Sequence, residues 1–285
     1  TRRISINRLA PAIALCAAVT SPALAQLELP RLSPRATVSQ IVGLTDVTIA
    51  YCRPAVRERT IWGELVPFGE VWRTGANEAT TITFSSDVTV EGKPVPAGTY
   101  GLFTIPGKDL WTVIINKGAK QWGAYDYKAE EDLFRFTVTP QPAPFTERLT
   151  FTFPNTTTDS AEIALTWEKV HLGFTVKVDI VGKVLVDARK AIAELKTDDW
   201  RTPLRAASFC LDNNVNLDEA RGWAEKSLAV KETMYGLAAK ARFVALDGDT
   251  AAAIVLARKA IEVGKAADPK ADTTSVERLI AGWSK

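Results

Sequence analysis

The sequence predicts a two-part protein in which an all-β antiparallel sandwich is followed by an all-α helical domain. Before about Asp179, apolar residues alternate with polar ones at period two, as in strands with one buried face. After about Lys183 they recur at spacings of three and four, as in amphipathic helices. Turn residues separate most of the alternating segments. We expect a signal peptide over residues 1–25, a β domain over 33–180 and a helical domain over 184–285.

The first 25 residues have the order of regions typical of a secretory signal. These regions are the basic residues Arg2, Arg3 and Arg8, the apolar run 9–19 and the small-residue site Ala23-Leu24-Ala25. The apolar run is too short to span a bilayer, and Pro11 interrupts it. Ser5 and Asn7 fit the twin-arginine pattern poorly, so a Sec-type signal is expected. Cleavage near Ala25 would place the mature chain in the periplasm or outside the cell.

Charge excludes some partners once this segment is set aside. The chain has 35 basic and 33 acidic residues, and removing the three signal arginines leaves 32 basic residues and a net charge of −1. The basic pI is therefore no evidence for a nucleic-acid or anionic-membrane partner. No later segment approaches 18 apolar residues, so no membrane span is expected in the mature chain. Cys52 and Cys210 are too few for a disulfide framework, and a single bridge between them stays open.

Nine or ten short strands are expected in the first half. Their alternating apolar residues are, in order, Val47, Ile49 and Tyr51; Ile82 and Phe84; Val88 and Val90; Trp111, Val113 and Ile115; Phe134, Phe136 and Val138; Leu149, Phe151 and Phe153; Ile163, Leu165 and Trp167; and Leu172, Phe174, Val176 and Val178. Turn residues at 91–93, 96–98, 106–108 and 154–155 separate many of these segments. The pattern leaves two long loops, 53–79 and 118–133, as the places where a site is expected.

The second half begins with a helix whose apolar stripe is Leu185, Ala188, Ile192 and Leu195. The segment 216–231 then aligns with 249–265 at an offset of 33 residues, which pairs Ala220 with Ala253 and Ala224 with Ala257. A helix pair with this period resembles the tetratricopeptide family, although the family's tryptophan-leucine-glycine signature is absent. Because only about two repeats are present, we expect this part to pack on the β domain or on its own flanking helices.

The stretch from Ser33 to about Val178 also resembles a family of secreted bacterial proteins known as domain of unknown function 2911. The residues that carry the resemblance are Ser33-Pro34, Val42-Gly43, Arg53-Pro54, Arg59-Thr60-Ile61-Trp62-Gly63, Leu65-Val66-Pro67, Val71-Trp72-Arg73-Thr74-Gly75-Ala76-Asn77-Glu78-Ala79-Thr80, Pro96-Ala97-Gly98-Thr99-Tyr100, Phe103-Thr104-Ile105-Pro106-Gly107, Trp111 and Gln121-Trp122-Gly123. Glu70 departs from the basic residue expected there. The resemblance implies a type of protein and no mechanism, since no activity is assigned to the family.

The residue inventory excludes several chemistries. The one histidine, His171, alternates with polar residues of its strand and is expected to be solvated, and no G-x-S-x-G segment exists for a catalytic triad. Too few His and Cys residues are present for a zinc site. The segment from Gly101 to Lys108 lacks the spacing, the hydroxyl residue and the following helix of a phosphate loop. No cofactor or metal is predicted.

The two long loops supply the candidate ligand-binding residues. These are Arg53, Arg59, Trp62, Arg73, Asn77, Glu78, Trp122 and Tyr125. Aromatic faces, which Trp72 and Tyr127 also offer, suit sugar rings, while the planar arginines suit carboxylates. Asn77 and Glu78 add hydrogen-bond donors and acceptors. The same residues also suit a purely structural role, with aromatic plugs, Arg–Glu ties and a left-handed turn at Gly75.

The leading functional expectation is a secreted or periplasmic binding protein. Its β domain would hold a small polar or carbohydrate-like ligand under the two loops, and its helical domain would offer a groove to a protein partner. One alternative is a cofactor-free hydrolase of envelope polysaccharide, acting through the loop carboxylates Glu64, Glu78 and Asp126. Another alternative is a structural scaffold of the cell envelope. A convergent polar pocket would favour binding, and a carboxylate pair of suitable spacing in a cleft would favour hydrolysis.

Overall fold

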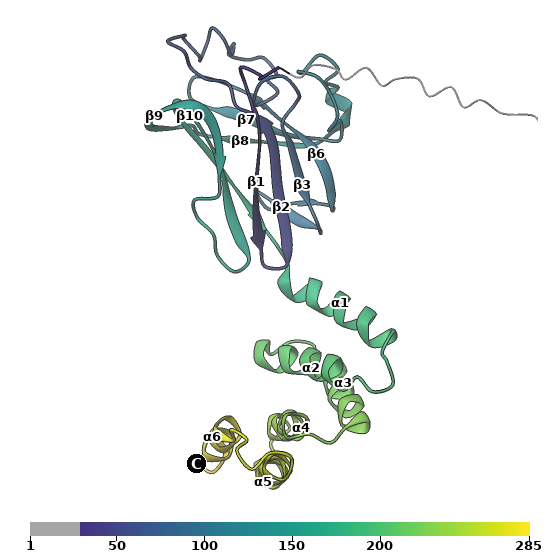
Figure 1. The fold of residues 1–285 in the computed structure, drawn as a ribbon. Coiled ribbons are helices and arrows are strands. Elements are labelled where there is room, and N and C mark those ends of the chain that lie inside the picture. The colour runs from purple at the N-terminus through teal and green to yellow at the C-terminus, as the bar shows by residue number, and fades with distance from the viewer. Residues whose placement is uncertain (1–28) are drawn as a thin grey trace, which may run out of the picture.

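The computed structural model describes residues 29–285 and shows a layered β structure followed by a train of helices (Figure 1). The predicted signal peptide lies outside the described residues. The strands are β1 (Arg35–Val42), β2 (Thr45–Cys52), β3 (Thr81–Phe84), β4 (Val88–Val90), β5 (Lys93–Val95), β6 (Gly98–Ile105), β7 (Trp111–Asn116), β8 (Asp132–Val138), β9 (Gln141–Thr152) and β10 (Ser160–Lys177). A short 3-10 helix, η1 (Ala129–Glu131), precedes β8.

The strands form two antiparallel sheets that pack face to face. One sheet has the order β1-β2-β3-β6-β7-β8, and the other has the order β5-β4-β10-β9. The apolar residues of the period-two pattern point into the space between them, so Val47, Ile82, Trp111, Leu165 and Phe174 are all buried in one core. This confirms the predicted fold class for the first half. The period-two pattern arises because alternate side chains of a strand point to opposite faces, of which one is buried here.

Strand β10 differs from the expectation in being one strand of 18 residues where the pattern indicated two. The residues that face the main core are odd-numbered up to Trp167 and even-numbered from Leu172 onward, and Ala164 is buried in addition. Between them Glu168 has a left-handed backbone, with φ of 55°, and the pairing with β9 shifts register on both sides of it. An irregularity of this kind reverses the faces without ending the strand, which is why the change of phase resembled a break.

Three strands escaped the period-two pattern. Strand β5 has only three residues, of which Val95 alone is buried, so it shows no alternation. Strand β1 lies at an open edge of the six-stranded sheet, and its side chains are mostly exposed or half-buried. Strand β6 is buried on both faces over its central residues, so its sequence runs apolar without alternation. Phe103 of β6 and Ile114 of β7 face outward, away from the main core. They are covered by Val71 and Ala124 of the two long loops, which makes a second, smaller core on the outer face of this sheet.

The helical part consists of α1 (Ile180–Ala193), α2 (Arg201–Asn213), α3 (Leu217–Val230), α4 (Met234–Leu246), α5 (Thr250–Ala267) and α6 (Thr274–Trp283). The change of periodicity near Asp179 therefore coincides with the start of α1. Asp179 caps that helix by accepting a hydrogen bond from the Gly182 amide at 2.9 Å. Leu195 of the expected stripe lies beyond the end of α1, while Ile192 is buried. Between residues 29 and 285, no helix is both long and apolar enough to cross a membrane.

The 33-residue offset is present in the helices themselves. Helices α2 and α4 begin 33 residues apart, as do α3 and α5. The four paired alanines, Ala220, Ala224, Ala253 and Ala257, are all buried, as close packing of helices requires. Kinship with the tetratricopeptide family stays a prediction.

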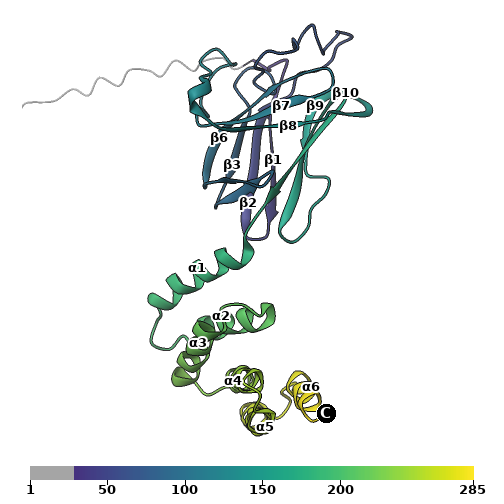
Figure 2. The same ribbon diagram turned by 180° about the vertical axis from the view of Figure 1, so that it is seen from behind.

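The repeats pack on their own flanking helices, one of the two arrangements expected. Ile192 of α1 joins the core of α2 and α3, and Val276 of α6 joins the core of α4 and α5. Figures 1 and 2 show the helices leading away from the sandwich, with α1 following directly on β10.

Candidate functional site

The two long loops meet on the outer face of the six-stranded sheet and pair with each other. The Ala79 amide donates to the Gln121 carbonyl at 3.0 Å, and the Gly123 amide donates to the Asn77 carbonyl at 2.9 Å. Glu78 and Trp122 are thereby joined in an antiparallel bridge. The first loop is also tied to β6 through two backbone bonds between Trp72 and Thr104, of 2.7 and 2.9 Å. These bonds fix the crossing of the loops, and a recess lies on either side of it.

The turn that brings Glu78 to this crossing is built differently from the expectation. Thr74 and Asn77 have left-handed backbones, with φ of 54° and 58°, while the φ of Gly75 is not positive. Glycine is required at 75 by close packing, because a Cβ atom there would lie 3.2 Å from the Cys52 carbonyl oxygen and 2.9 Å from Thr80 Oγ1. Asn77 is among the residues that best tolerate the left-handed region. Its side-chain amide donates to the Ser33 carbonyl at 3.1 Å, which holds the segment before β1.

The larger recess at the crossing, the Trp122 recess, has a volume of about 520 Å³. Its lining residues are Arg35, Ala50, Tyr51, Cys52, Glu78, Ala79, Thr81, Thr99, Ala119, Lys120, Gln121 and Trp122. The floor is hollow because the outward-facing residues of three neighbouring strands, Ala50, Thr81 and Thr99, are small. The Trp122 ring is 55% exposed and lines this hollow.

Glu78 is the ionised group of the Trp122 recess. Arg31 Nη1 donates to Glu78 Oε1 at 2.7 Å and to Oε2 at 2.9 Å. The bond from Arg31, together with a backbone amide bond, lowers the pKa of Glu78 from 4.5 to about 2. The carboxylate therefore carries a full negative charge at neutral pH. It can accept hydrogen bonds from a ligand, and it cannot donate a proton.

Cys52 lies beneath Glu78 and lines the same recess. Its Sγ donates to Glu78 Oε2 at 3.3 Å. Burial raises the pKa of the Cys52 thiol, and the hydrogen bond to Glu78 raises it further. The sulfur is consequently a neutral thiol and a poor nucleophile. Cys52 and Cys210 are both buried as free thiols, so the bridge between them that the sequence left open is not formed.

Gln121 and two cations complete the Trp122 recess. Gln121 Nε2 donates to the Gly118 carbonyl at 2.7 Å, while its Oε1 is buried and has no hydrogen-bond partner among residues 29–285. A buried acceptor without a partner is rare in folded proteins, because leaving it unpaired costs about 1–3 kcal/mol. Arg35 and Lys120 bring positive charge to the lining. The recess thus combines the carboxylate of Glu78 paired with Arg31, the cations Arg35 and Lys120, the exposed face of Trp122 and, among residues 29–285, the unpaired acceptor of Gln121.

Three of the predicted site residues are engaged elsewhere in the fold. Arg53 donates to the Leu149 carbonyl at 3.0 Å and to Thr150 Oγ1 at 2.7 Å, which ties the first loop to β9. Arg59 donates to the Ala55 and Val56 carbonyls of its own loop. Trp62 packs in the main core, with ring centroids 4.8 Å from Trp111 and 5.6 Å from Trp167.

The remaining two predicted residues, Arg73 and Tyr125, line a smaller recess on the other side of the crossing. This Arg73 recess has a volume of about 270 Å³ and is lined by Leu65, Val66, Pro67, Glu70, Val71, Trp72, Arg73, Ala124 and Tyr125. The structure therefore brings Glu78 and Trp122 together, places Arg73 with Tyr125, and does not unite the two pairs. The exposed carboxylates Glu64 and Asp126 line neither recess.

Tyr127 belongs to a polar network that stabilises the second loop. Its hydroxyl donates to Asp132 at 2.8 and 2.9 Å, and Arg135 Nη2 donates to the Tyr127 oxygen at 2.7 Å. Burial and the bond to Asp132 raise the pKa of Tyr127 to about 12. The Tyr127 ring also packs on Phe103, with centroids 5.2 Å apart, so this residue holds the loop on the sheet and does not face a ligand.

Five of the polar contributors to the Trp122 recess were not among the predicted site residues: Arg31, Arg35, Cys52, Lys120 and Gln121. Arg35 and Cys52 face each other across the β1–β2 pair, so recognising β1 would have placed Arg35 there. Lys120 stands two residues before Trp122, which was a usable signal. Nothing in the sequence indicated Arg31, whose role depends on how the segment before β1 crosses the loop.

His171 has a partner within its own strand. Its Nε2 lies 3.1 Å from Glu162 Oε1, and the side chain is partly exposed. Asn155 bonds the other oxygen of that carboxylate. The pair lies on the four-stranded sheet and has no part in either recess.

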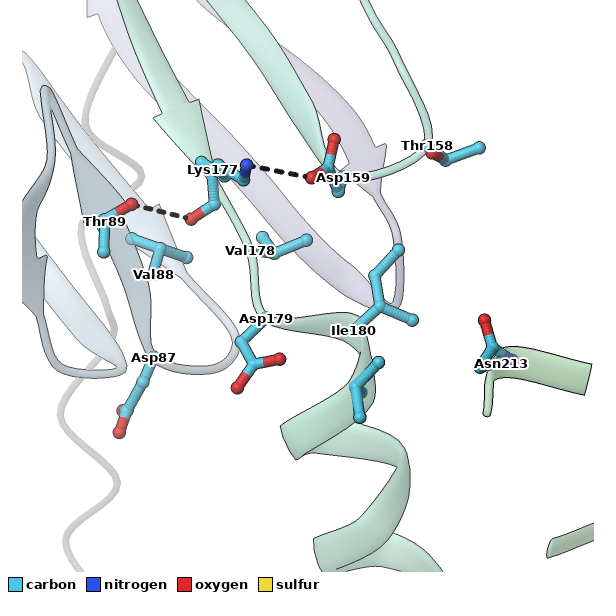
Figure 3. A pocket seen from close by; sticks show the side chains of 11 residues that line it. Asp87, Val88, Thr89, Thr158, Asp159, Lys177, Val178, Asp179, Ile180 and Asn213 are labelled. Carbon is cyan, nitrogen blue, oxygen red and sulfur yellow. Dashed lines mark hydrogen bonds and ion pairs between the residues drawn. The ribbon is translucent and has the colours of Figure 1, made fainter. Parts of the chain in front are cut away.

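A third hollow, of about 680 Å³, lies where β10 runs into α1 (Figure 3). Its charged side chains already make hydrogen bonds or ion pairs within the protein. Lys177 Nζ lies 3.2 Å from Asp159 Oδ2, Asp179 caps α1, and Asp87 accepts a bond from the Ala97 amide at 2.8 Å. Val88, Val178 and Ile180 supply its apolar surface, as Figure 3 shows. This hollow is the join between the sandwich and the helices.

The fold and the loops together define a class of protein: an antiparallel β-sandwich with a helical extension, carrying two recesses at a crossing of its long loops. A family model described as Protein of unknown function (DUF2911) matches residues 33–176, which is half of the chain. The chain belongs to this family, and the match spans β1 to β10, including both recesses. No curated protein and no solved structure matches the chain significantly.

Proposed function

We propose that this protein is a secreted or periplasmic binding protein whose Trp122 recess holds a small polyhydroxylated, carbohydrate-like ligand. The observation that carries the proposal is the half-exposed Trp122 ring beside an ionised Glu78 and the unpaired Gln121 Oε1. A sugar presents an apolar ring face together with hydroxyl donors. The ring face suits the indole, and the hydroxyl groups suit the two oxygen acceptors.

The charges of the recess favour binding over hydrolysis. A glycosidase needs one carboxyl group with a raised pKa to protonate the leaving group. Glu78, the carboxylate that lines the recess, has its pKa lowered to about 2, so it does not suit the role of that acid. The hydrolase alternative therefore gains no support from the geometry. Arg35 and Lys120 further suggest that the preferred sugar carries an acidic substituent.

The test is a binding screen of the mature chain with neutral and acidic mono- and oligosaccharides, read by thermal shift and by ligand-observed NMR. Replacing Trp122 by Ala should weaken binding roughly two- to tenfold, the equivalent of the 0.5–1.5 kcal/mol typical of an aromatic contact. Trp122→Phe should retain most of the affinity. Phe145→Ala serves as the control, since Phe145 is equally exposed on β9 of the other sheet. A screen without any binder, or equal binding by Trp122→Ala, would reject the proposal.

We further propose that the helical part engages a protein partner. A groove of about 300 Å³ lies across α2, α4 and α6, with exposed Tyr235 in its lining and an ion pair of 2.8 Å between Arg242 and Asp212 at its side. Exposed aromatic residues are enriched in protein interfaces. A cross-linking experiment with a photoreactive residue at 235 tests this. Position 255 is the control, because Val255 is also well exposed but lies on α5 outside the groove. Specific cross-linking from position 235 is expected, and equal labelling from both positions would count against the groove.

The localisation proposal rests on the first 25 residues alone. Fractionation of cells expressing the chain with residues 1–25 included should recover a shortened product outside the cytoplasm. Recovery of the uncleaved chain in the cytoplasm would overturn it.

A further inference from the structure

The Arg73 recess contains a cation whose side chain has no hydrogen-bond partner in the described part of the chain. Arg73 Nε is buried, and the Arg73 guanidinium makes no hydrogen bond or ion pair with residues 29–285. The neighbouring loop arginines behave differently, since Arg53 and Arg59 each donate to two oxygen atoms of the protein. A guanidinium that is partly buried without a partner loses hydration, and no hydrogen bond within the protein offsets this loss.

The position of Arg73 is nevertheless fixed by its surroundings. Its backbone carbonyl accepts from the Thr80 amide at 3.1 Å, and the next residue, Thr74, is buried and donates its hydroxyl to the Trp72 carbonyl. Trp72 is stacked on Trp167 in the main core. The arginine is thus held at the recess by a rigid segment. Preorganisation of this kind is what a specific anion site needs.

The other residues of the recess restrict what the anion can be. Glu70 lines the same recess, is exposed, and has no ion-pair partner among residues 29–285. Leu65, Pro67 and Trp72 supply an apolar wall, and Tyr125, with 82% of its surface exposed, stands at the rim. Within about 270 Å³ the recess thus offers an apolar wall, one cation and one anion, neither of which is paired by any residue of 29–285. A free phosphate would meet the cation but would be repelled by Glu70 and would leave the apolar wall unused.

We propose that the Arg73 recess is a second ligand site, distinct from the Trp122 recess, and that it binds a free α-amino acid with an apolar side chain. The carboxylate of the ligand pairs with the Arg73 guanidinium, in the planar geometry that arginine favours. The ammonium group pairs with Glu70. The side chain lies against Leu65 and Pro67, and Tyr125 covers it from the rim.

The test is isothermal titration calorimetry of the intact protein with L-leucine and three matched probes. L-leucinamide lacks the carboxylate, 4-methylpentanoate lacks the ammonium group, and inorganic phosphate lacks both the ammonium group and the apolar side chain. Leucine should bind at least tenfold more tightly than either organic probe, and phosphate should show no binding. Leucinamide that equals leucine, phosphate that exceeds it, or the absence of leucine binding would overturn the proposal.

Variants then assign the roles. Arg73→Gln should abolish leucine binding, and Glu70→Gln should weaken it at least tenfold while restoring no affinity for leucinamide. Arg59→Gln is the matched control, because Arg59 belongs to the same loop but faces the Ala55 and Val56 carbonyls. If Arg73→Gln fails to fold by circular dichroism, the exposed Glu70→Gln decides the question by itself. Trp122→Ala should leave leucine binding unchanged, which separates this site from the sugar proposal.

Discussion

The ion pair between Arg31 and Glu78 permits a prediction with a defined sign and size. Glu78→Gln keeps the shape of the side chain and removes its charge. The pKa of Glu78 is about 2 in the folded protein against an ordinary value of 4.5. A carboxyl group with a lowered pKa stabilises the fold above its ordinary pKa. The stabilisation by Glu78 is therefore present above about pH 4.5 and is lost as the pH falls toward 2.

The size of the effect is limited by exposure. The side chains of Glu78 and Arg31 are 38% and 51% exposed, so water and salt screen the charges. Exposed ion pairs of this kind contribute about 0.2–1 kcal/mol, and the two bonds from Arg31 place this pair toward the upper end. We expect Glu78→Gln to lower the free energy of unfolding by about 0.5–1 kcal/mol at pH 7.

A double-mutant cycle isolates the pair. Urea unfolding of the wild type, Arg31→Gln, Glu78→Gln and the double variant gives the coupling energy at each condition. It should be largest at pH 7 in low salt, smaller in 1 M salt, and smaller again at pH 2.5. A carbon-13 titration of the Glu78 carboxyl group gives its pKa directly. A coupling energy of zero at pH 7, or one that does not change between pH 7 and pH 2.5, would refute the reasoning.

Three further predictions concern the parts of the fold that support the site. Phe103→Ala should lower the free energy of unfolding by about 3–5 kcal/mol in urea denaturation, because Phe103 is fully buried beneath the loops. The control Phe145→Ala, at an exposed position, should change the free energy of unfolding by less than about 0.5 kcal/mol. Tyr127 should ionise near pH 12 in ultraviolet titration, and ionisation near pH 10 would contradict the network with Asp132. Tyr127→Phe should remove a contribution to stability that is present below pH 10 and is lost as the pH rises toward 12. Ala253→Leu should lower the free energy of unfolding by about 1–3 kcal/mol in thermal or urea denaturation, because Ala253 is buried between helices. Ala251→Leu, at an exposed position of the same helix, should lower it little, and equal effects of the two variants would contradict the packing.

The sequence predicted those elements of the fold whose buried residues recur at the regular spacing of a strand or a helix. Alternation at Trp111, Val113 and Ile115 identifies β7 and its buried face, and the spacing of Ala220 and Ala224 identifies the packed face of α3. Strand β6 was missed because Phe103 is buried on the outer face, which removes the alternation that reveals a strand. That burial depends on loops distant in the sequence, so no local pattern records it.

The sequence indicated the two loops that meet at the crossing, but not how their side chains are grouped. The two loops were identified, and Glu78 and Trp122 do meet. Arg73 was expected with them, yet it lies on the other side of the crossing. The direction of each loop side chain depends on single backbone angles, such as the positive φ of Thr74 and Asn77. Unlike a strand or a helix, such a loop has no period from which the facing of its residues follows.

The β1–β2 hairpin connects two distant parts of the molecule. At one end, Arg35 and Cys52 line the Trp122 recess. At the other, Gly43 lies so close to the start of the helical part that a Cβ atom there would be 2.8 Å from Ile180 Cγ1. Strands of eight residues hold these ends roughly 26 Å apart. Under the two binding proposals, a small molecule at the loops and a protein at the helices would therefore not compete for space, and each could be tested without disturbing the other.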